Sequence, residues 1–268
     1  MTSEPELAIV KGPSEAAALA AGRVATALAQ SVAERGRADW ATTGGSAALG
    51  IYRHLVKAPL RDAVPWGSVH VWWGDDRYVP RDHPRSNVKP FDDVMLAIGL
   101  TEEGEAAGRP HGVPLPIENL HPFRTGESIG EARGAAWCAA NLADELRAAG
   151  LPDQDGWPIF DLVLLGVGAD GHVLSVFPGS AAFDSRELAL AIPAPTHVEP
   201  KVERVTLNPA VLGVARHLLV VVGGNVKAAA VAAIFGDERD PRRWPGQLAR
   251  HGRAVWILDE ACAPTLRR

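Results

Sequence analysis

Residues 160–179 read FDLVLLGVGADGHVLSVFPG, and no other stretch of the chain carries as clear a structural signal. The apolar run from Phe160 to Leu165 predicts a buried β-strand, so the glycine-rich segment after it leaves the carboxyl end of that strand. In open α/β sheets, ligands bind in the crevice outside those strand ends. Gly166, Gly168 and Gly171 let the backbone turn sharply and approach a ligand closely. The stretch therefore predicts a ligand-binding loop at the edge of a sheet.

Asp170 and His172 stand on this loop, an acid and an imidazole two residues apart. A histidine exchanges protons near neutral pH, which makes His172 a candidate acid–base group. A solvated histidine on a surface loop is the alternative. The loop also contains G-x-G-x-x-G, the dinucleotide-binding fingerprint, but that fingerprint should open a helix and Pro178 follows here instead. We therefore expect no nicotinamide cofactor.

Strand-like and helix-like segments alternate along most of the chain, which predicts one α/β domain over 1–268 with a largely parallel, Rossmann-like open sheet and helices on both faces. Ser14 is the expected N-cap of the first helix. Residues 100–128 are rich in Gly, Pro and acidic residues and predict a long surface excursion. The predicted strands cover 7–10, 39–43, 68–73, 160–165, 188–192, 204–207, 217–222 and 254–258. The predicted helices cover 14–35, 47–56, 88–98, 129–149 and 226–234.

Composition narrows the class of protein. The chain has 268 residues, 47% of them hydrophobic and 22% charged, as in an ordinary globular protein. A net charge of −5 gives no basic stripe for nucleic acid, so no nucleic-acid partner is expected. Cys138 and Cys262 are too few for a disulfide framework and predict reduced core thiols in the cytoplasm. We see neither a signal peptide nor a run of about 18 apolar residues, and expect no membrane association.

The segment TTGGS, residues 42–46, lies between a predicted strand and a predicted helix. The free amides at the start of a helix, with hydroxyl groups beside them, favour anions through the helix dipole. Thr43, Gly44, Gly45 and Ser46 are therefore candidate phosphate-binding residues. A tight turn without a ligand would use the same glycines.

A second polar cluster follows the next strand, in WWGDDRYVPRDHPRSN, residues 72–87. We expect Asp75, Asp76 and Arg77 to lie in a loop directly after that strand. The planar guanidinium of Arg77 suits phosphate or carboxylate. The alternative is a surface ion pair between Asp76 and Arg77.

In VVVGGNVKAAA, residues 220–230, a predicted strand and two glycines precede a predicted helix. Lys227 falls in the first turn of that helix, where the dipole disfavours cations. A lysine there is explained if it reaches an anion at the same helix end; a surface lysine is the alternative. If the sheet is parallel, the loops bearing Ser46, Arg77, His172 and Lys227 all line one crevice. The histidines show no H-x-x-x-H spacing and have no cysteine partner, so we expect no metal.

Taken together, these motifs resemble the 6-phosphogluconolactonase and glucosamine-6-phosphate deaminase family. TGGS at 43–46, WGDDR at 73–77, the glycine loop at 166–179 and RVTLN at 204–208 occur in the family's order. IENLHPFRTGE, residues 117–127, resembles the stretch before the family's central helix. The resemblance implies a sugar-phosphate isomerase/deaminase-like fold and, on the lactonase side, hydrolysis of 6-phospho-D-glucono-1,5-lactone in the pentose phosphate pathway.

The resemblance also implies roles. His172 is the expected general base, without metal or organic cofactor. Asp170 is expected to orient its imidazole or to hold a sugar hydroxyl. The substrate is the one expected partner of a monomer or weak dimer. The candidate substrate- and phosphate-binding residues are Thr43, Gly44, Gly45, Ser46, Asp75, Arg77, Gly168, Gly171, Arg204 and Lys227.

Two alternatives remain at the level of sequence. A glucosamine-6-phosphate deaminase of this family carries a glutamate five residues beyond the loop histidine, where this chain has Phe177. A non-catalytic sugar-phosphate sensor on the same fold would carry a DNA-binding segment before the first helix, where we expect only a short strand. Both comparisons favour the lactonase.

Overall fold

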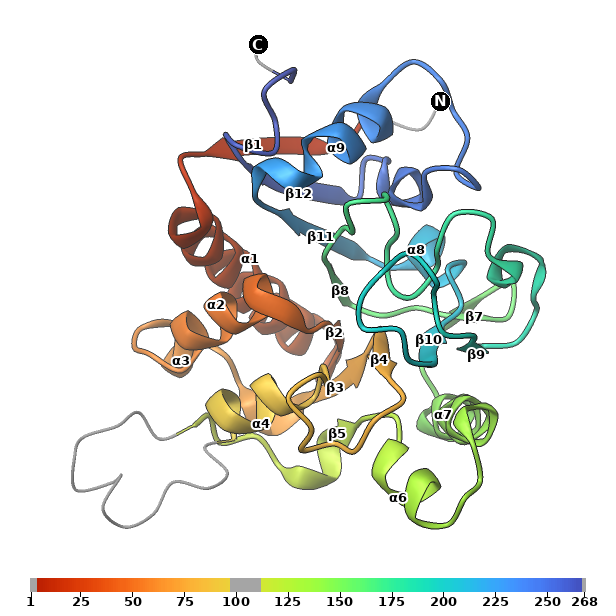
Figure 1. The fold of residues 1–268 in the computed structure, drawn as a ribbon. Helices are drawn as coiled ribbons and strands as arrows, with labels where there is room; N and C mark the ends of the chain where they lie inside the picture. Colours follow the sequence, from red (N-terminus) through yellow and green to blue (C-terminus); the bar gives the residue numbers. More distant parts are fainter. Residues whose placement is uncertain (1–3, 97–111, 267–268) are drawn as a thin grey trace.

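The computed structural model of the chain describes residues 4–96 and 112–266. A seven-stranded sheet forms its centre, with the order β1-β12-β11-β8-β2-β3-β5 (Figure 1). Every neighbouring pair in this sheet is parallel, as the alternation of strands and helices predicted. Its strands are β1 (Glu6–Val10), β2 (Ala38–Thr42), β3 (Val69–Trp73), β5 (Leu120–His121), β8 (Leu162–Leu165), β11 (His217–Val222) and β12 (Ala254–Asp259).

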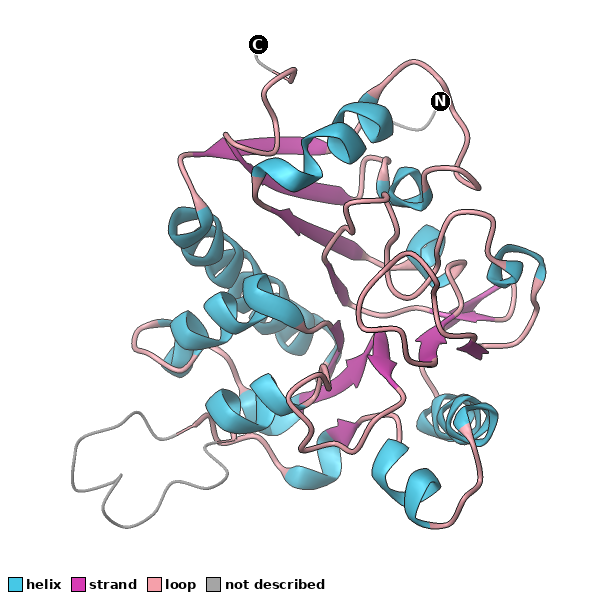
Figure 2. Ribbon diagram, viewed as in Figure 1, coloured by secondary structure: helices cyan, strands magenta, loops and turns pink. Residues whose placement is uncertain are grey.

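The central strands are buried because helices cover both faces of the sheet. All residues of β2 and β8 are buried, which explains why β8 reads as a continuous apolar run. α1 (Pro13–Arg35) packs on α2 (Gly45–Leu55) and against β2, β8, β11 and β12. Figure 2 shows helices on both sides of the twisted sheet. The largest side chains that are fully buried include Trp40, Trp66, Trp72, Trp73, Trp256, Tyr52, Phe91 and Phe160.

The predicted helices are found with local differences, and the short helices at 60–63 and 211–214 were not predicted. α1 begins at Pro13 with Gly12 as N-cap and no side-chain cap, so the expected capping by Ser14 is wrong. The single helix expected over 129–149 is two helices, because Gly134 adopts a φ of 82° between them. The α-helices are α1 (Pro13–Arg35), α2 (Gly45–Leu55), α3 (Leu60–Ala63), α4 (Lys89–Met95), α6 (Thr125–Gly130), α7 (Ala135–Ala149), α8 (Val211–Val214) and α9 (Ala228–Phe235).

A second, three-stranded sheet lies beside the main one, in the order β4-β10-β9. Its strands are β4 (Asp75–Arg77), β9 (Ala189–Ile192) and β10 (Arg204–Leu207), and both pairs are antiparallel. The loop expected at Asp75–Arg77 is therefore a short strand. The remaining pair of strands, β6 (Asp153–Gln154) and β7 (Trp157–Pro158), forms a separate hairpin.

α1 is long and apolar enough, by length and composition, to cross a membrane. It is nevertheless a core helix, because Ala20, Ala21, Val24 and Leu28 are buried where it packs against the sheet. Residues 100–111 of the surface excursion expected over 100–128 lie outside the described residues. Its described part contains β5, α6 and a 3₁₀ helix at Ile117–Asn119.

Candidate active site

The direction of the chain connections reverses between two neighbouring central strands. From β2 the chain continues through α2 to β3 on one side, and from β8 it continues to β11 on the other. Ligands in open α/β sheets bind outside the carboxyl ends of the strands at such a switch point. The TTGGS segment and the glycine loop both emerge there, as the sequence predicted.

An open pocket of about 210 Å³ lies at this point. It brings together side chains from the ends of β2, β3, β8 and β11, although these segments are far apart in the sequence. The predicted site residues that line it are Thr43, Gly44, Asp75, Arg77, Gly168, His172 and Lys227. The other lining residues are Asn87, Gly166, Val167 and Leu174.

Asp170 does not line the pocket, but it holds the histidine that does. His172 Nδ1 lies 2.5 Å from Asp170 Oδ1, and the His172 backbone amide donates to the same oxygen at 3.2 Å. Burial alone would raise the pKa of Asp170, but the hydrogen bonds and charge of His172, with a further bond from His197, hold it well below its usual value. An ionised carboxylate only accepts hydrogen bonds, so Nδ1 of His172 carries a proton, and in the neutral ring the lone pair is on Nε2.

Two glycines make this arrangement possible. A Cβ on Gly168 would lie 2.1 Å from His172 Nδ1 and 2.6 Å from Asp170 Oδ1, so any side chain there would displace the pair. Gly171 has a φ of 82°, and a Cβ on it would lie 2.8 Å from the Trp244 ring. Both glycines therefore shape the loop, and only Gly168 also faces the pocket.

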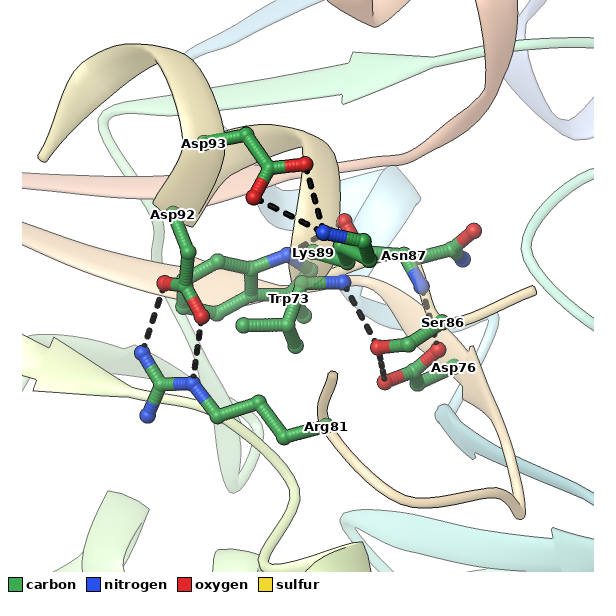
Figure 3. A network of polar contacts seen from close by, with 9 residues as sticks. Trp73, Asp76, Arg81, Ser86, Asn87, Lys89, Asp92 and Asp93 are labelled. Atoms are coloured by element: carbon green, nitrogen blue, oxygen red, sulfur yellow. Dashed lines mark hydrogen bonds and ion pairs between the residues drawn. The ribbon is translucent and has the colours of Figure 1, made fainter. Parts of the chain in front are cut away.

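Asp76 anchors the loop that carries Asn87 into the pocket. Its Oδ1 accepts from the backbone amides of Arg77 at 2.7 Å and Asn87 at 2.6 Å, and its Oδ2 accepts from Ser86 Oγ at 3.0 Å. Figure 3 shows the contacts of Asp76 with Ser86 and Asn87. Trp73 Nε1 donates to the Asn87 carbonyl at 3.2 Å. Burial raises the pKa of Asp76 to about 7. Asp76 is fully buried, so the surface ion pair considered for Asp76 and Arg77 is absent from the described residues.

Asp75 joins three of the pocket segments. It accepts from Ser175 Oγ at 2.6 Å and from Asn87 Nδ2 at 3.1 Å. Gly44 packs tightly on the same amide, because a Cβ there would lie 2.1 Å from Asn87 Oδ1. The carboxylate of Asp75 thus fixes the walls of the pocket as well as lining it.

Two cations face the pocket without an acidic partner among the described residues. Arg77 donates through Nη1 to the Arg85 carbonyl at 2.7 Å, which leaves the rest of its guanidinium available. Lys227 ends the 3₁₀ turn Asn225–Lys227 and is the N-cap of α9, so it lies just before the helix and not in its first turn as expected. Burial lowers the pKa of Lys227. Two like charges at one pocket favour a bound anion.

Arg204 is not among the residues that line the pocket. It stands opposite Arg77 in the β4–β10 pair and is buried, with Nη2 donating to the Pro200 carbonyl at 2.7 Å. Its Nε and Nη1 have no partner among the described residues. Burial, and then the charge of Arg77, lowers the pKa of Arg204 to about 10. Arg204 therefore adds positive charge behind Arg77 without direct access to the pocket.

Gly45 and Ser46 are exposed at the start of α2. Ser46 lines an adjoining cavity of about 610 Å³, which Lys227 also lines. Neither residue reaches the smaller pocket with His172. The predicted phosphate-binding motif is thus divided, with Thr43 and Gly44 in the pocket of His172 and Ser46 in the adjoining cavity.

Sequence reasoning missed several residues that build the site. Asn87 stands in the quoted 72–87 segment, and its place in a polar loop was the one available signal. Ser175 and Leu174 belong to the glycine loop but had no distinguishing pattern. His197, whose Nε2 lies 2.9 Å from Asp170 Oδ2, comes from a segment in which the sequence showed no motif.

Fold and pocket together define a class, the sugar-phosphate enzymes built on an open parallel sheet with an anion site at its switch point. Residues 11–256 match the family model of glucosamine-6-phosphate isomerases/6-phosphogluconolactonase, so the chain belongs to this family.

Relatives and solved structures give the same result. The chain is 31% identical over 245 residues to a 6-phosphogluconolactonase of Synechocystis sp., and this match covers 91% of each chain. It is 32% identical to a 6-phosphogluconolactonase of Mycobacterium tuberculosis over 93% of each chain. The 6-phosphogluconolactonase of Trypanosoma brucei superposes with a TM-score of 0.82 at 26% identity, over 99% of this chain and 100% of that one. A monomeric glucosamine-6-phosphate deaminase shares the fold, with a TM-score of 0.72 at 18% identity, over 98% of this chain and 100% of that one.

Proposed function

We propose that the chain hydrolyses 6-phospho-D-glucono-1,5-lactone to 6-phospho-D-gluconate, the second step of the oxidative pentose phosphate pathway. The proposal is supported by the family and by the names of its relatives. One observation carries it: a single pocket pairs a carboxylate-held imidazole, His172, with two cations, Arg77 and Lys227. The imidazole suits water activation, and the cations suit a phosphate.

His172 acts as the general base in this proposal. A lactone is an activated ester, so the reaction needs a positioned water, a base and stabilisation of the oxyanion. Nε2 of His172 takes a proton from the water that attacks C1. The imidazolium then returns this proton to the ring oxygen as the tetrahedral intermediate opens. Asp170 holds the imidazole through Nδ1 and stabilises its charged form.

Arg77 and Lys227 hold the 6-phosphate. Charge-assisted hydrogen bonds to a phosphate are roughly twice as strong as neutral ones, and the dianion relieves repulsion between the two cations. Thr43 and Gly44 line the same wall before α2, whose first amides favour negative charge. The buried Arg204 reinforces this potential from behind Arg77.

The deaminase alternative is less well supported. The position five residues beyond His172 is Phe177, whose ring lies 4.8 Å from the imidazole, centroid to centroid. A phenyl ring there supplies no carboxylate for ring opening and isomerisation. A non-catalytic sensor would not need the Asp170–His172 pair.

Further features complete the proposal. One domain over 1–268 is favoured because β1 and β12, from the two ends of the chain, are neighbours in one sheet. Cys138 and Cys262 are free and buried, in keeping with a cytoplasmic enzyme. We also propose that it works as a monomer or weak dimer, without metal or organic cofactor.

The direct test is incubation of purified protein with freshly generated 6-phosphogluconolactone. Acid release should exceed the spontaneous rate in proportion to enzyme concentration. Glucosamine-6-phosphate, tested in parallel, should release no ammonia. Ammonia release without lactone hydrolysis would favour the deaminase instead.

A further inference from the structure

Asp170 is held by two histidines. His172 Nδ1 lies 2.5 Å from its Oδ1, and His197 Nε2 lies 2.9 Å from its Oδ2. His197 belongs to the segment between β9 and β10, so it reaches the glycine loop from the neighbouring antiparallel sheet. Each carboxylate oxygen of Asp170 therefore has its own imidazole.

This arrangement fixes which nitrogen of each ring donates to Asp170. An ionised carboxylate only accepts hydrogen bonds, so Nδ1 of His172 and Nε2 of His197 both donate to it. Rotation of Asp170 about its side-chain bonds would break one or both contacts. With His197 in place the carboxylate is held, and Nε2 of His172 stays directed away from it.

Phe177 connects the two rings a second time. Its ring lies 4.8 Å from that of His172 and 5.7 Å from that of His197, centroid to centroid. The side chain of His197 is 51% exposed, whereas those of His172 and Asp170 are 21% and 18% exposed. His197 is thus the most exposed of the three and lies nearest to solvent.

We infer that His197 is a positioning residue for the proposed base: it orients Asp170, and through Asp170 it sets the tautomer and the basicity of His172. This rests on the proposed function only in calling His172 the base. The hydrogen bond from His197 also neutralises part of the charge that Asp170 offers to the imidazolium of His172. The other charged groups that line the pocket with His172 are Asp75, Arg77 and Lys227.

Two variants separate the hydrogen bond from the bulk of the ring. His197→Phe retains a ring beside Phe177 but donates nothing, and His197→Gln offers an amide N–H near the place of Nε2. His217→Phe is the matched control, because His217 is exposed at the first residue of β11, at the opposite edge of the sheet. All three variants should fold, since both histidines lie at the surface.

The activity readout is the pH profile of kcat/KM on the lactone. His197→Phe should lower kcat by about 10-fold, the usual cost of losing a partner that orients a functional side chain. The acid limb of its profile should also move to higher pH, because Asp170 then offers its full charge to His172. His197→Gln should restore kcat to within about 3-fold of wild type, and His217→Phe should match wild type.

A second readout needs no substrate. Nitrogen-15 NMR of the imidazole rings follows the titration of His172 directly in each protein. We expect the His172 titration to move to higher pH in His197→Phe and to stay near wild type in His197→Gln and His217→Phe. An unchanged titration in His197→Phe, or equal changes in the Phe and Gln variants, would overturn the inference. If the wild type proves inactive on the lactone, the proposed function fails and the NMR titration still decides the role of His197.

Discussion

The change Asp76→Asn should abolish the pH dependence of stability that Asp76 imposes on the fold. In the wild type both backbone amides, of Arg77 and Asn87, donate to Oδ1, and Ser86 Oγ donates to Oδ2. An asparagine keeps Oδ1 for the two amides and places Nδ2 beside the Ser86 hydroxyl, which also accepts. The variant therefore loses the buried charge and little else.

The magnitude follows from the raised pKa of Asp76. Burial moves it from 3.8 to about 7. Between these values an unfolded Asp76 has lost its proton while the folded one retains it, so stability falls as the pH rises from about 4 to about 7. At about 1.4 kcal/mol per pKa unit, the ionisation of Asp76 should lower the free energy of unfolding of the wild type by about 3 kcal/mol as the pH rises from 5 to 8.

Urea unfolding at pH 5 and pH 8 measures this effect. The free energy of unfolding of Asp76→Asn, relative to wild type, should increase by about 3 kcal/mol from pH 5 to pH 8. Asp144→Asn is the control, because the Asp144 side chain is 76% exposed and its removal should give no such trend. Asp76→Ala leaves three buried donors without an acceptor and should cost about 3 kcal/mol or more even at pH 5. A difference between Asp76→Asn and wild type that does not change with pH would refute the reasoning.

Three further predictions concern the pocket. Arg77→Ala and Lys227→Ala should lower kcat/KM for the phosphorylated lactone at least about 10-fold more than for gluconolactone, because their contacts are with the phosphate. Equal losses on the two substrates would show that the two residues do not bind the phosphate. Gly168→Ala should lower kcat by about 100-fold, since the new Cβ displaces His172, whereas Gly22→Ala, with no atom within 4 Å of its Cβ, should leave it unchanged. A Gly168→Ala enzyme with normal turnover would contradict the tight fit of the loop. Exhaustive chelation should leave activity intact, and loss that one specific divalent ion restores would show a metal requirement.

The parallel sheet could be predicted because its strands have local signals. β8 is a short run of buried aliphatic residues, and glycines follow it where the backbone must turn, so strand and loop were found together. β2, β3 and β11 likewise end in glycine or polar residues at the switch point. The predictions of the fold class and of four loops meeting at one pocket depended on these local signals. They also used the rule that ligands bind outside the carboxyl ends of parallel strands.

The second sheet and the outer part of the site could not be predicted in the same way. Asp75–Arg77 has no strand propensity and becomes β4 because it pairs with β10, far away in the sequence. The contact between His197 and Asp170 likewise spans an irregular segment that no local pattern positions. The break before α7 was missed because helix-forming residues surround it, although Ala132 and Gly134 both adopt a positive φ there.

The turnover of freshly generated 6-phosphogluconolactone by wild type and by His172→Ala bears most directly on the proposed chemistry. His172→Ala should lower kcat by about 10²–10⁴, the usual contribution of a general base. Thermal stability is measured in parallel, because the substitution also removes the contacts of His172 with Asp170 and Phe177. A folded His172→Ala protein that keeps more than half of the wild-type kcat would show that His172 is not the base.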